Sequence, residues 1–132
     1  MNLDALSLTW APRLLSVLRI MTGLLFLQHG TQKILGFPPS ERGMPALLSL
    51  SGTAGLLELV GGVLIVLGLF TRPVAFILSG QMAVAYFLAH AQRSFYPILN
   101  GGELAILFCF VILYLAAAGP GPWSLDAQRR RV

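Results

Sequence analysis

Four long apolar stretches, separated by short polar segments, dominate the chain. An α-helix needs roughly 20 mainly apolar residues to cross the hydrocarbon core of a bilayer, so four such helices fit within 132 residues. The pattern therefore predicts an all-α fold, an integral membrane four-helix bundle that forms one domain over residues 1–132. The predicted helices cover about residues 12–33, 52–70, 73–91 and 101–118.

Proline and glycine set the predicted helix boundaries. Pro12 suits the first position of a helix, which leaves residues 1–11 as a short amphipathic lead. Residues 36–51 contain three prolines and are too broken to span a membrane. Residues 93–100 form a short loop, and residues 119–122 end the fourth helix with a run of glycine and proline.

Composition places the chain among membrane proteins. Only 11% of its residues are charged, against about 25% in soluble domains, and 56% are hydrophobic. Three of the positive charges form the run 129–131, which is better explained as a topology signal or a lipid-headgroup contact than as a nucleic-acid site. Cys109 is the single cysteine, so any redox role requires an electron carrier supplied by another protein.

The distribution of positive charge predicts the orientation. Four crossings place both termini on the same side of the membrane. Cytoplasmic loops carry an excess of lysine and arginine. Placing both termini in the cytoplasm puts Arg13, Arg72 and residues 129–131 inside, against Lys33, Arg42 and Arg93 outside. We therefore expect a multi-pass membrane protein with both termini cytoplasmic.

Two charged residues lie inside the predicted crossings. Glu58 shares its helix face with Gly55, Gly61 and Gly62, so we expect it to point into the bundle, where another helix can approach closely. Such a carboxylate either handles protons or forms a buried ion pair or hydrogen-bond network that fixes the helix register. For Arg19 we expect the side chain to extend toward the inner membrane surface without a partner.

The polar ends of all four helices meet in the outer leaflet. The first and third helices end there and the second and fourth begin there, which predicts a pocket that narrows toward Glu58. We assign proton handling to Glu58 and His29, and no metal site. Lys33 and Arg93 suit headgroup contact equally well, and His90 and Asn100 also suit capping of helix ends. The candidate ligand-binding residues are Lys33, His90, Asn100, Glu103, Tyr86 and Arg93.

Four short motifs in this order resemble the DoxX family of small bacterial membrane proteins, from about Arg13 to Gly121. The motifs are His29-Gly30-x-x-Lys33, Gly55-x-x-Glu58-x-x-Gly61-Gly62, Gly68-Leu-Phe-Thr-Arg72 and Asn100-Gly101-Gly102-Glu103. The resemblance implies a four-helix bundle in the bacterial cytoplasmic (inner) membrane. It also implies association with quinone-linked oxidoreductases that act on thiosulfate or in oxidative-stress defence.

Two function classes follow. In the first, the protein is an accessory subunit of a quinone-linked oxidoreductase, with no intrinsic cofactor, a bound quinone, and a slot lined by Tyr86, Phe26 and Phe110. In the second, it is a non-enzymatic module that binds or transports a small molecule or lipid. Metal or haem binding by His29 and His90 and a purely structural role are weaker hypotheses. The expected partners are the lipid bilayer, redox-enzyme subunits and a second copy of the chain, with no nucleic acid.

Overall fold

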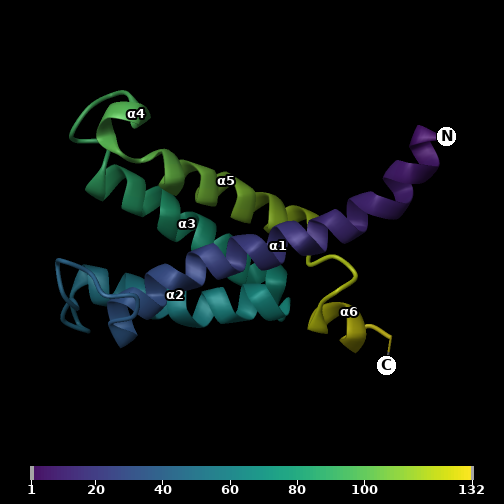
Figure 1. The fold of residues 1–132 in the computed structure, drawn as a ribbon, viewed down its shortest axis with the longest axis horizontal. Coiled ribbons are helices and arrows are strands. Elements are labelled where there is room, and N and C mark those ends of the chain that lie inside the picture. Colours follow the sequence, from purple (N-terminus) through teal and green to yellow (C-terminus); the bar gives the residue numbers. More distant parts are fainter. Residues whose placement is uncertain (1, 132) are drawn as a thin grey trace.

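The computed structural model describes residues 2–131, and within them the chain is all-helical, as predicted. Four long helices lie side by side and alternate in direction, with two short helices at the ends of the bundle (Figure 1). The helices are α1 (Leu3–Leu35), α2 (Leu50–Leu67), α3 (Thr71–Ala89), α4 (Pro97–Asn100), α5 (Glu103–Ala118) and α6 (Leu125–Arg129).

Three of the long helices have the length and apolar composition of a membrane crossing. These are α1, α2 and α3, while α5 is equally apolar but has 16 residues. At about 1.5 Å per residue α5 is roughly 24 Å long, somewhat less than the hydrocarbon core. It starts at Glu103 because Gly101 takes a left-handed φ of 74° and closes α4 as its C-cap.

The first helix is longer than predicted. It begins at Leu3, where the Asn2 side chain caps it by accepting a hydrogen bond from the Asp4 N–H, so the expected start at Pro12 is wrong. Pro12 lies inside the helix, which tolerates one missing backbone hydrogen bond there. Its 33 residues span about 50 Å, and the N-terminal part of α1 extends beyond the other helices (Figure 1).

Glycines allow α1 and α2 to pack closely. Gly23 and Gly30 on α1 and Gly55 and Gly62 on α2 are each seven residues apart, and all four are buried. A methyl group added to Gly30 would lie 2.3 Å from the backbone nitrogen of Leu59. The two backbones therefore meet with no side chain between them, as in other membrane helix pairs with small residues at the interface.

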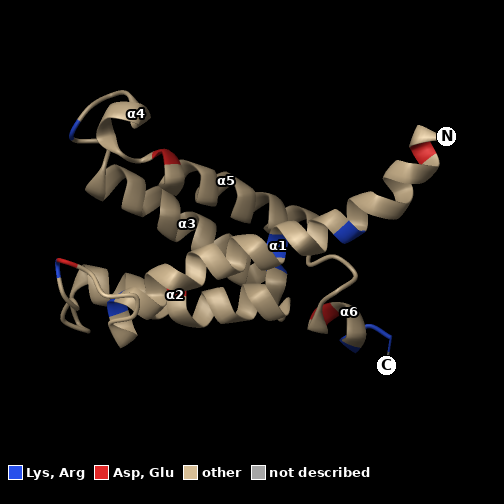
Figure 2. Cartoon of the chain, viewed as in Figure 1, with Lys and Arg blue, Asp and Glu red and all other residues tan. Residues whose placement is uncertain are grey.

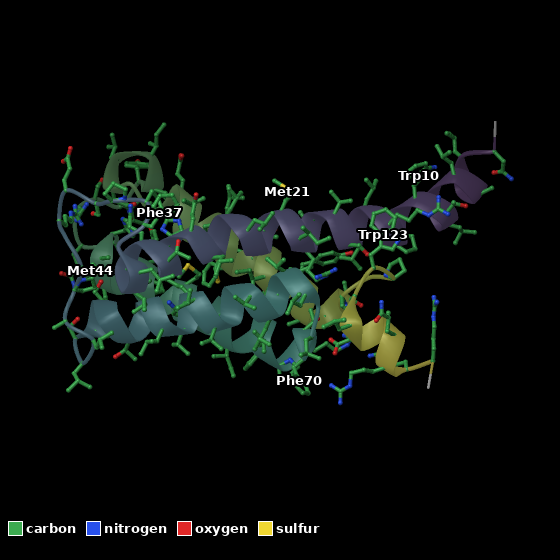
Figure 3. The ribbon with its side chains drawn as sticks, turned by 60° about the horizontal axis from the view of Figure 1, so that its bottom comes forward. Trp10, Met21, Phe37, Met44, Phe70 and Trp123 are labelled. Carbon is green, nitrogen blue, oxygen red and sulfur yellow. The ribbon has the colours of Figure 1, made fainter. Side chains whose placement is uncertain are left out.

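The core lies between the four long helices and the outer surface is apolar. Phe26 and Phe108 meet edge to face in the core, with ring centroids 5.4 Å apart. Large apolar side chains cover the outside, where a bilayer would contact them; Met21 points away from the bundle in Figure 3. Charged residues gather toward the two ends (Figure 2). The buried core residues are Phe26, Ile65, Ala75, Leu78, Met82, Phe108, Ile112 and Leu115.

Arg19 does not extend to the membrane surface as expected; it is fully buried and bound to backbone carbonyls. Its Nη1 donates to Ile65 O (2.7 Å) and Val66 O (2.5 Å) at the end of α2. Its Nε donates to Pro120 O (2.8 Å), and Nη2 donates to Trp123 O. The last carbonyls of a helix lack partners within the helix. Arg19 donates hydrogen bonds to these carbonyls and so ties α2 to the segment after α5.

The short helix α6 holds the C-terminal segment against the turn between α2 and α3. The Asp126 carboxylate accepts hydrogen bonds from the N–H groups of Phe70 (3.0 Å) and Thr71 (2.9 Å), and the Asp126 N–H donates to Gly68 O (2.9 Å). Partial burial would raise the pKa of Asp126. The hydrogen bonds from Thr71 and Phe70 and the charge of Arg129 outweigh this effect and hold that pKa below its usual value.

Both chain ends lie at the same end of the bundle, together with α6 (Figure 1). Trp10 and Trp123 are also found there, each about half exposed (Figure 3). Indole rings are enriched at the boundary between lipid and water. The opposite end carries α4 and the loop between α1 and α2, and the candidate site lies on that side.

Candidate functional site

A cavity of about 300 Å³ lies where α1 and α3 end and α2 and α5 begin. One wall comes from α1 and α2 and the other from α3 and α5. Four polar residues singled out in the sequence line it, namely His29, Lys33, Glu58 and His90. The remaining lining is mostly apolar and consists of Phe26, Met82, Ala85, Ala89, Gly101, Leu104, Ala105 and Phe108.

Glu58 forms an ion pair with Lys33 across the α1–α2 interface. The Lys33 Nζ lies 2.9 Å from Oε1 and 2.8 Å from Oε2 of Glu58. Glu58 is 3% exposed, whereas the Lys33 side chain is 28% exposed and reaches the cavity mouth. Gly55, one turn before Glu58, makes room for the lysine stem, because a methyl group there would lie 2.8 Å from the Lys33 Cβ. The carboxylate is thus both buried and paired.

Gln81 on α3 is a site residue that the sequence analysis missed. Its Nε2 donates to Glu58 Oε1 (3.2 Å) and to Ala54 O (3.3 Å). Its Oε1 is buried and has no partner within residues 2–131. An uncharged amide inside a predicted crossing was the available signal, because amides in membrane helices usually bond to another helix. Gln81 connects the ion pair to the second half of the bundle.

His29 faces the cavity with its ring free of hydrogen bonds to the described residues. The ring is half-buried and meets Phe108 edge to face, with centroids 6.1 Å apart and planes at 90°. Phe26, His29 and Lys33 share one face of α1 because they are three and four residues apart. An imidazole with unoccupied nitrogens can donate to or accept from a ligand in the cavity.

His90 lines the α3 side of the cavity, and residues outside the cavity fix the position of its ring. Its Nδ1 lies 3.1 Å from Asn100 O, and its ring stacks on Tyr86. The Asn100 side chain donates to Tyr86 Oη (3.1 Å) and to Ser94 O (3.0 Å). It also accepts from the Gly102 N–H (2.8 Å). Tyr86 and Asn100 therefore do not line the cavity; they join the end of α3 to the turn before α5.

The remaining predicted binding residues lie outside the cavity. Arg93 and Glu103 are exposed and do not line it. Phe110, expected to line the slot, is 64% exposed, and Phe108 occupies the inner face instead. Because α5 is apolar on every side, hydropathy alone could not tell which face turns inward. The aromatic lining of the cavity is therefore Phe26 and Phe108 and does not include Tyr86 or Phe110.

The residues around the cavity do not include a ready metal-ligand set. Across residues 2–131, no three His, Cys, Asp or Glu side chains lie close enough together to hold a metal ion. His29 and His90 line opposite walls of the cavity. Their free nitrogens are suited to hydrogen bonding with an organic ligand.

The fold defines a helical membrane bundle with a polar cavity at one end. The family model described as DoxX matches residues 14–91, more than half of the chain. The chain therefore belongs to the DoxX family, as its four motifs indicated.

Three relatives cover most of the chain. It is 45% identical over 126 residues to an uncharacterized protein of Haemophilus influenzae, covering 89% of this chain and 91% of the relative. It is 31% identical over 119 residues to the inner membrane protein YqjF of Escherichia coli (83% and 87% covered). It is 28% identical over 115 residues to the "Putative oxidoreductase CatD" of Bacillus subtilis (83% and 82% covered). No solved structure matches the chain significantly.

Proposed function

We propose that this protein is a membrane subunit of, or partner to, a quinone-linked oxidoreductase, and that its cavity binds the quinone headgroup. The observation that carries the proposal is one cavity lined both by the aromatic rings of Phe26 and Phe108 and by the polar groups of His29 and Lys33. Ligand sites of this kind are mainly apolar, with a few polar groups that fix orientation. A flat ring with carbonyl oxygens at its edges matches both features.

Each polar residue has a distinct task in this proposal. The Lys33 ammonium donates a hydrogen bond to a carbonyl oxygen and stabilises negative charge that develops there. The His29 imidazole supplies a proton to an oxygen, as general acids do. Glu58 remains behind Lys33 as its counter-ion and, in the ionised form, accepts from both Lys33 and Gln81. The electrons come from a redox group in the partner protein.

The comparisons support the proposal at a coarser level. One relative is named as a putative oxidoreductase and another as an inner membrane protein. We therefore propose that the protein lies in a bacterial inner membrane and contacts a redox-enzyme subunit there. The second function class is a non-enzymatic module that binds or transports a small molecule or lipid, and within it a small anion is less favoured by the geometry. The ion pair of Lys33 with Glu58 leaves no net positive charge to attract a free anion, and Arg93 does not line the cavity.

We also propose that both termini face the cytoplasm. Arg13 lies in the N-terminal part of α1, Arg72 at the start of α3 and residues 129–131 at the end of α6 and just after it. These segments lie at the end of the bundle that holds both termini (Figure 1), and cytoplasmic segments are enriched in such residues. In this orientation the candidate site opens toward the outer leaflet. A C-terminal fusion to a fluorescent protein that folds only in the cytoplasm should be bright, and a dark, intact fusion would reverse the orientation.

The binding proposal is tested by titrating short-chain ubiquinone and menaquinone analogues into the protein in lipid nanodiscs, with calorimetric detection. Ala89 lines the cavity mouth on α3, so Ala89→Phe should fill it and abolish binding. Leu88→Phe is the matched control, because Leu88 is 53% exposed on the same helix and does not line the cavity. Equal binding by both variants would contradict the proposed site.

The partner proposal needs a second measurement. Membranes with and without the protein are compared for quinone reduction by quinone-linked dehydrogenases, and His29→Gln is tested beside the wild type. We expect turnover of one such enzyme to fall without the protein, and to fall about 100-fold or less with His29→Gln, the range attributed to the lower end of general acid–base catalysis. Failure of both quinone binding and turnover effects would exclude the proposed function.

A further inference from the structure

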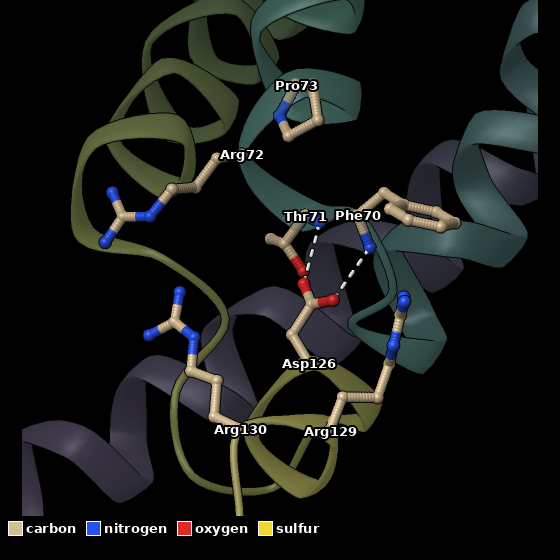
Figure 4. A pocket seen from close by; sticks show the side chains of 7 residues that line it. All are labelled: Phe70, Thr71, Arg72, Pro73, Asp126, Arg129 and Arg130. Atoms are coloured by element: carbon tan, nitrogen blue, oxygen red, sulfur yellow. Dashed lines mark hydrogen bonds between the residues drawn. The ribbon is translucent and has the colours of Figure 1, made fainter. Parts of the chain in front are cut away.

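A second cavity lies at the opposite end of the bundle, where α3 begins and α6 ends. Its volume is about 380 Å³, and it is lined by Arg72, Arg129 and Arg130 together with Asp126 and residues 70, 71 and 73. Figure 4 shows the three arginine side chains placed around Asp126. Three guanidinium groups thus share this space with one carboxylate.

The Asp126 carboxylate already accepts hydrogen bonds from the backbone. Asp126 accepts from the N–H groups of Phe70 and Thr71 at the first turn of α3. The one ion pair found among residues 2–131 is Lys33–Glu58, so none of the three arginines is paired with an acid there. Three positive charges therefore share this space with the single negative charge of Asp126, which leaves two of them without a counter-ion from the described part of the chain.

Packing holds two of the arginines in position. Arg72 donates through Nη1 to Ala116 O (3.0 Å) and to Ala117 O, at the end of α5. The Arg129 guanidinium lies over the Phe70 ring, 5.1 Å from its centroid. Arg130 lines the cavity without a hydrogen bond from its side chain to the rest of residues 2–131. The remaining donors are free to bind an anion.

The position of this cavity indicates where the anion comes from. It lies at the end of the membrane-crossing helices, where the half-exposed aromatic ring of Phe70 lines it. Basic pockets at this depth meet lipid headgroups, and guanidinium groups bind phosphate oxygens through paired hydrogen bonds. We propose that Arg72, Arg129 and Arg130 bind the phosphate group of an anionic phospholipid, with its acyl chains along the apolar outer face of α3.

The neighbouring Arg131 provides a matched control. It belongs to the same basic run, but it lines a different hollow, with Trp123 and Gln128 on the other side of α6. Arg130→Gln and Arg131→Gln change the net charge equally and both residues are exposed. A general attraction of the basic tail to anionic membranes would be weakened equally by the two variants.

The experiment is native mass spectrometry of the full chain released from nanodiscs that contain phosphatidylglycerol and phosphatidylethanolamine. We expect one phosphatidylglycerol per chain in the wild type and in Arg131→Gln. Arg130→Gln should bind it about fivefold more weakly, the effect of roughly one arginine at a membrane surface. Circular dichroism and the melting temperature check that both variants fold.

A second arm separates a lipid from a dissolved phosphate. Inorganic phosphate is titrated at constant ionic strength into the delipidated protein while the melting temperature is followed. A rise of the melting temperature in the wild type that Arg130→Gln lacks would support the phosphate site but assign it to a soluble phosphate. Equal lipid binding by Arg130→Gln and Arg131→Gln, with no phosphate effect in either variant, would overturn the proposal.

Discussion

At the scale of single residues, Arg19 shows how a charge can be buried in a membrane bundle without an acidic partner. Four backbone carbonyls surround its guanidinium group, two from the end of α2 and two from the segment after α5. Gly68 makes this possible, because a methyl group there would lie 2.9 Å from the Arg19 Cζ. Hydrophobicity predicts neither the carbonyl contacts nor the inward direction of the side chain.

We expect Arg19→Gln to destabilise the bundle strongly. Each carbonyl left without a donor costs about 1–3 kcal/mol, so the loss should exceed about 3 kcal/mol in the free energy of unfolding. Unfolding in mixed micelles with increasing denaturing detergent measures it. The control is Arg13→Gln, because Arg13 is exposed and only lies over the Trp10 ring. A loss of stability no larger than that of the control would contradict the role of Arg19 in holding α2 to the segment after α5.

Glu58 was the residue most accessible to sequence reasoning, because a carboxylate among glycines inside an apolar helix has few explanations. The structure shows the buried ion pair that was one of the two alternatives. The partner Lys33 could be found from its position one turn after His29 on the same face of α1. The contact of Gln81 with Glu58 could not be found in this way, because nothing in the sequence of α3 fixes which face of that helix turns toward α2.

Glu58→Gln should retain the helical fold but lose the ion pair. We expect a loss of about 1–3 kcal/mol, less than for a fully buried pair, since Lys33 can turn toward the surface. As the ammonium leaves the cavity, affinity for the quinone analogue should fall about tenfold. The double variant with Lys33→Met should be less destabilised than the sum of the two single variants. Additive losses would show that the pair contributes no coupling energy.

At the scale of helices, the contact between α1 and α2 depends on glycines that replace side chains at the interface. The apolar stretches in the sequence were sufficient to predict the four long helices. The seven-residue glycine spacing on both helices then explains why these two pack so closely. The short helices α4 and α6 were not predicted, because four- and five-residue helices carry too little periodic pattern and depend on tertiary contacts such as those of Asp126.

We expect Gly30→Ala to separate α1 from α2. The added methyl would lie 2.3 Å from backbone, which cannot move aside as a flexible side chain does, so the variant should lose about 1–3 kcal/mol. Gly80→Ala on α3 is the control, since nothing lies within 4 Å of its added methyl. The control should be neutral or slightly stabilised. Equal melting temperatures for the two variants would contradict the close packing.

Docking of α6 should depend on pH through Asp126. Because its folded-state pKa is lowered, the contribution of its carboxylate is complete above about pH 4 and is lost as the pH falls through the lower folded-state value. In a Trp10→Phe background, Trp123 is the remaining tryptophan, and its fluorescence should change over this acidic range. The same transition in Asp126→Asn would show that another group is responsible.

At the scale of the whole molecule, the two ends of the bundle carry different features. One end holds the two termini, the buried Arg19 with its carbonyl partners, and the arginine-lined cavity. The other end holds the proposed quinone cavity between the two helix pairs. Alternating helix direction, which follows from four crossings, was sufficient to predict from the sequence that His29, Lys33, Glu58 and His90 lie together. Only the packed structure shows that Phe108, and not Phe110, faces the cavity.

The most direct test of the account is whether a quinone occupies the cavity in the cell. Native mass spectrometry of the protein extracted gently from its own membrane, as wild type, Ala89→Phe and Leu88→Phe, answers this. We predict a quinone-sized mass on the wild type and on Leu88→Phe that Ala89→Phe lacks. A quinone retained equally by Ala89→Phe, or absent from all three proteins, would contradict the assignment of this cavity.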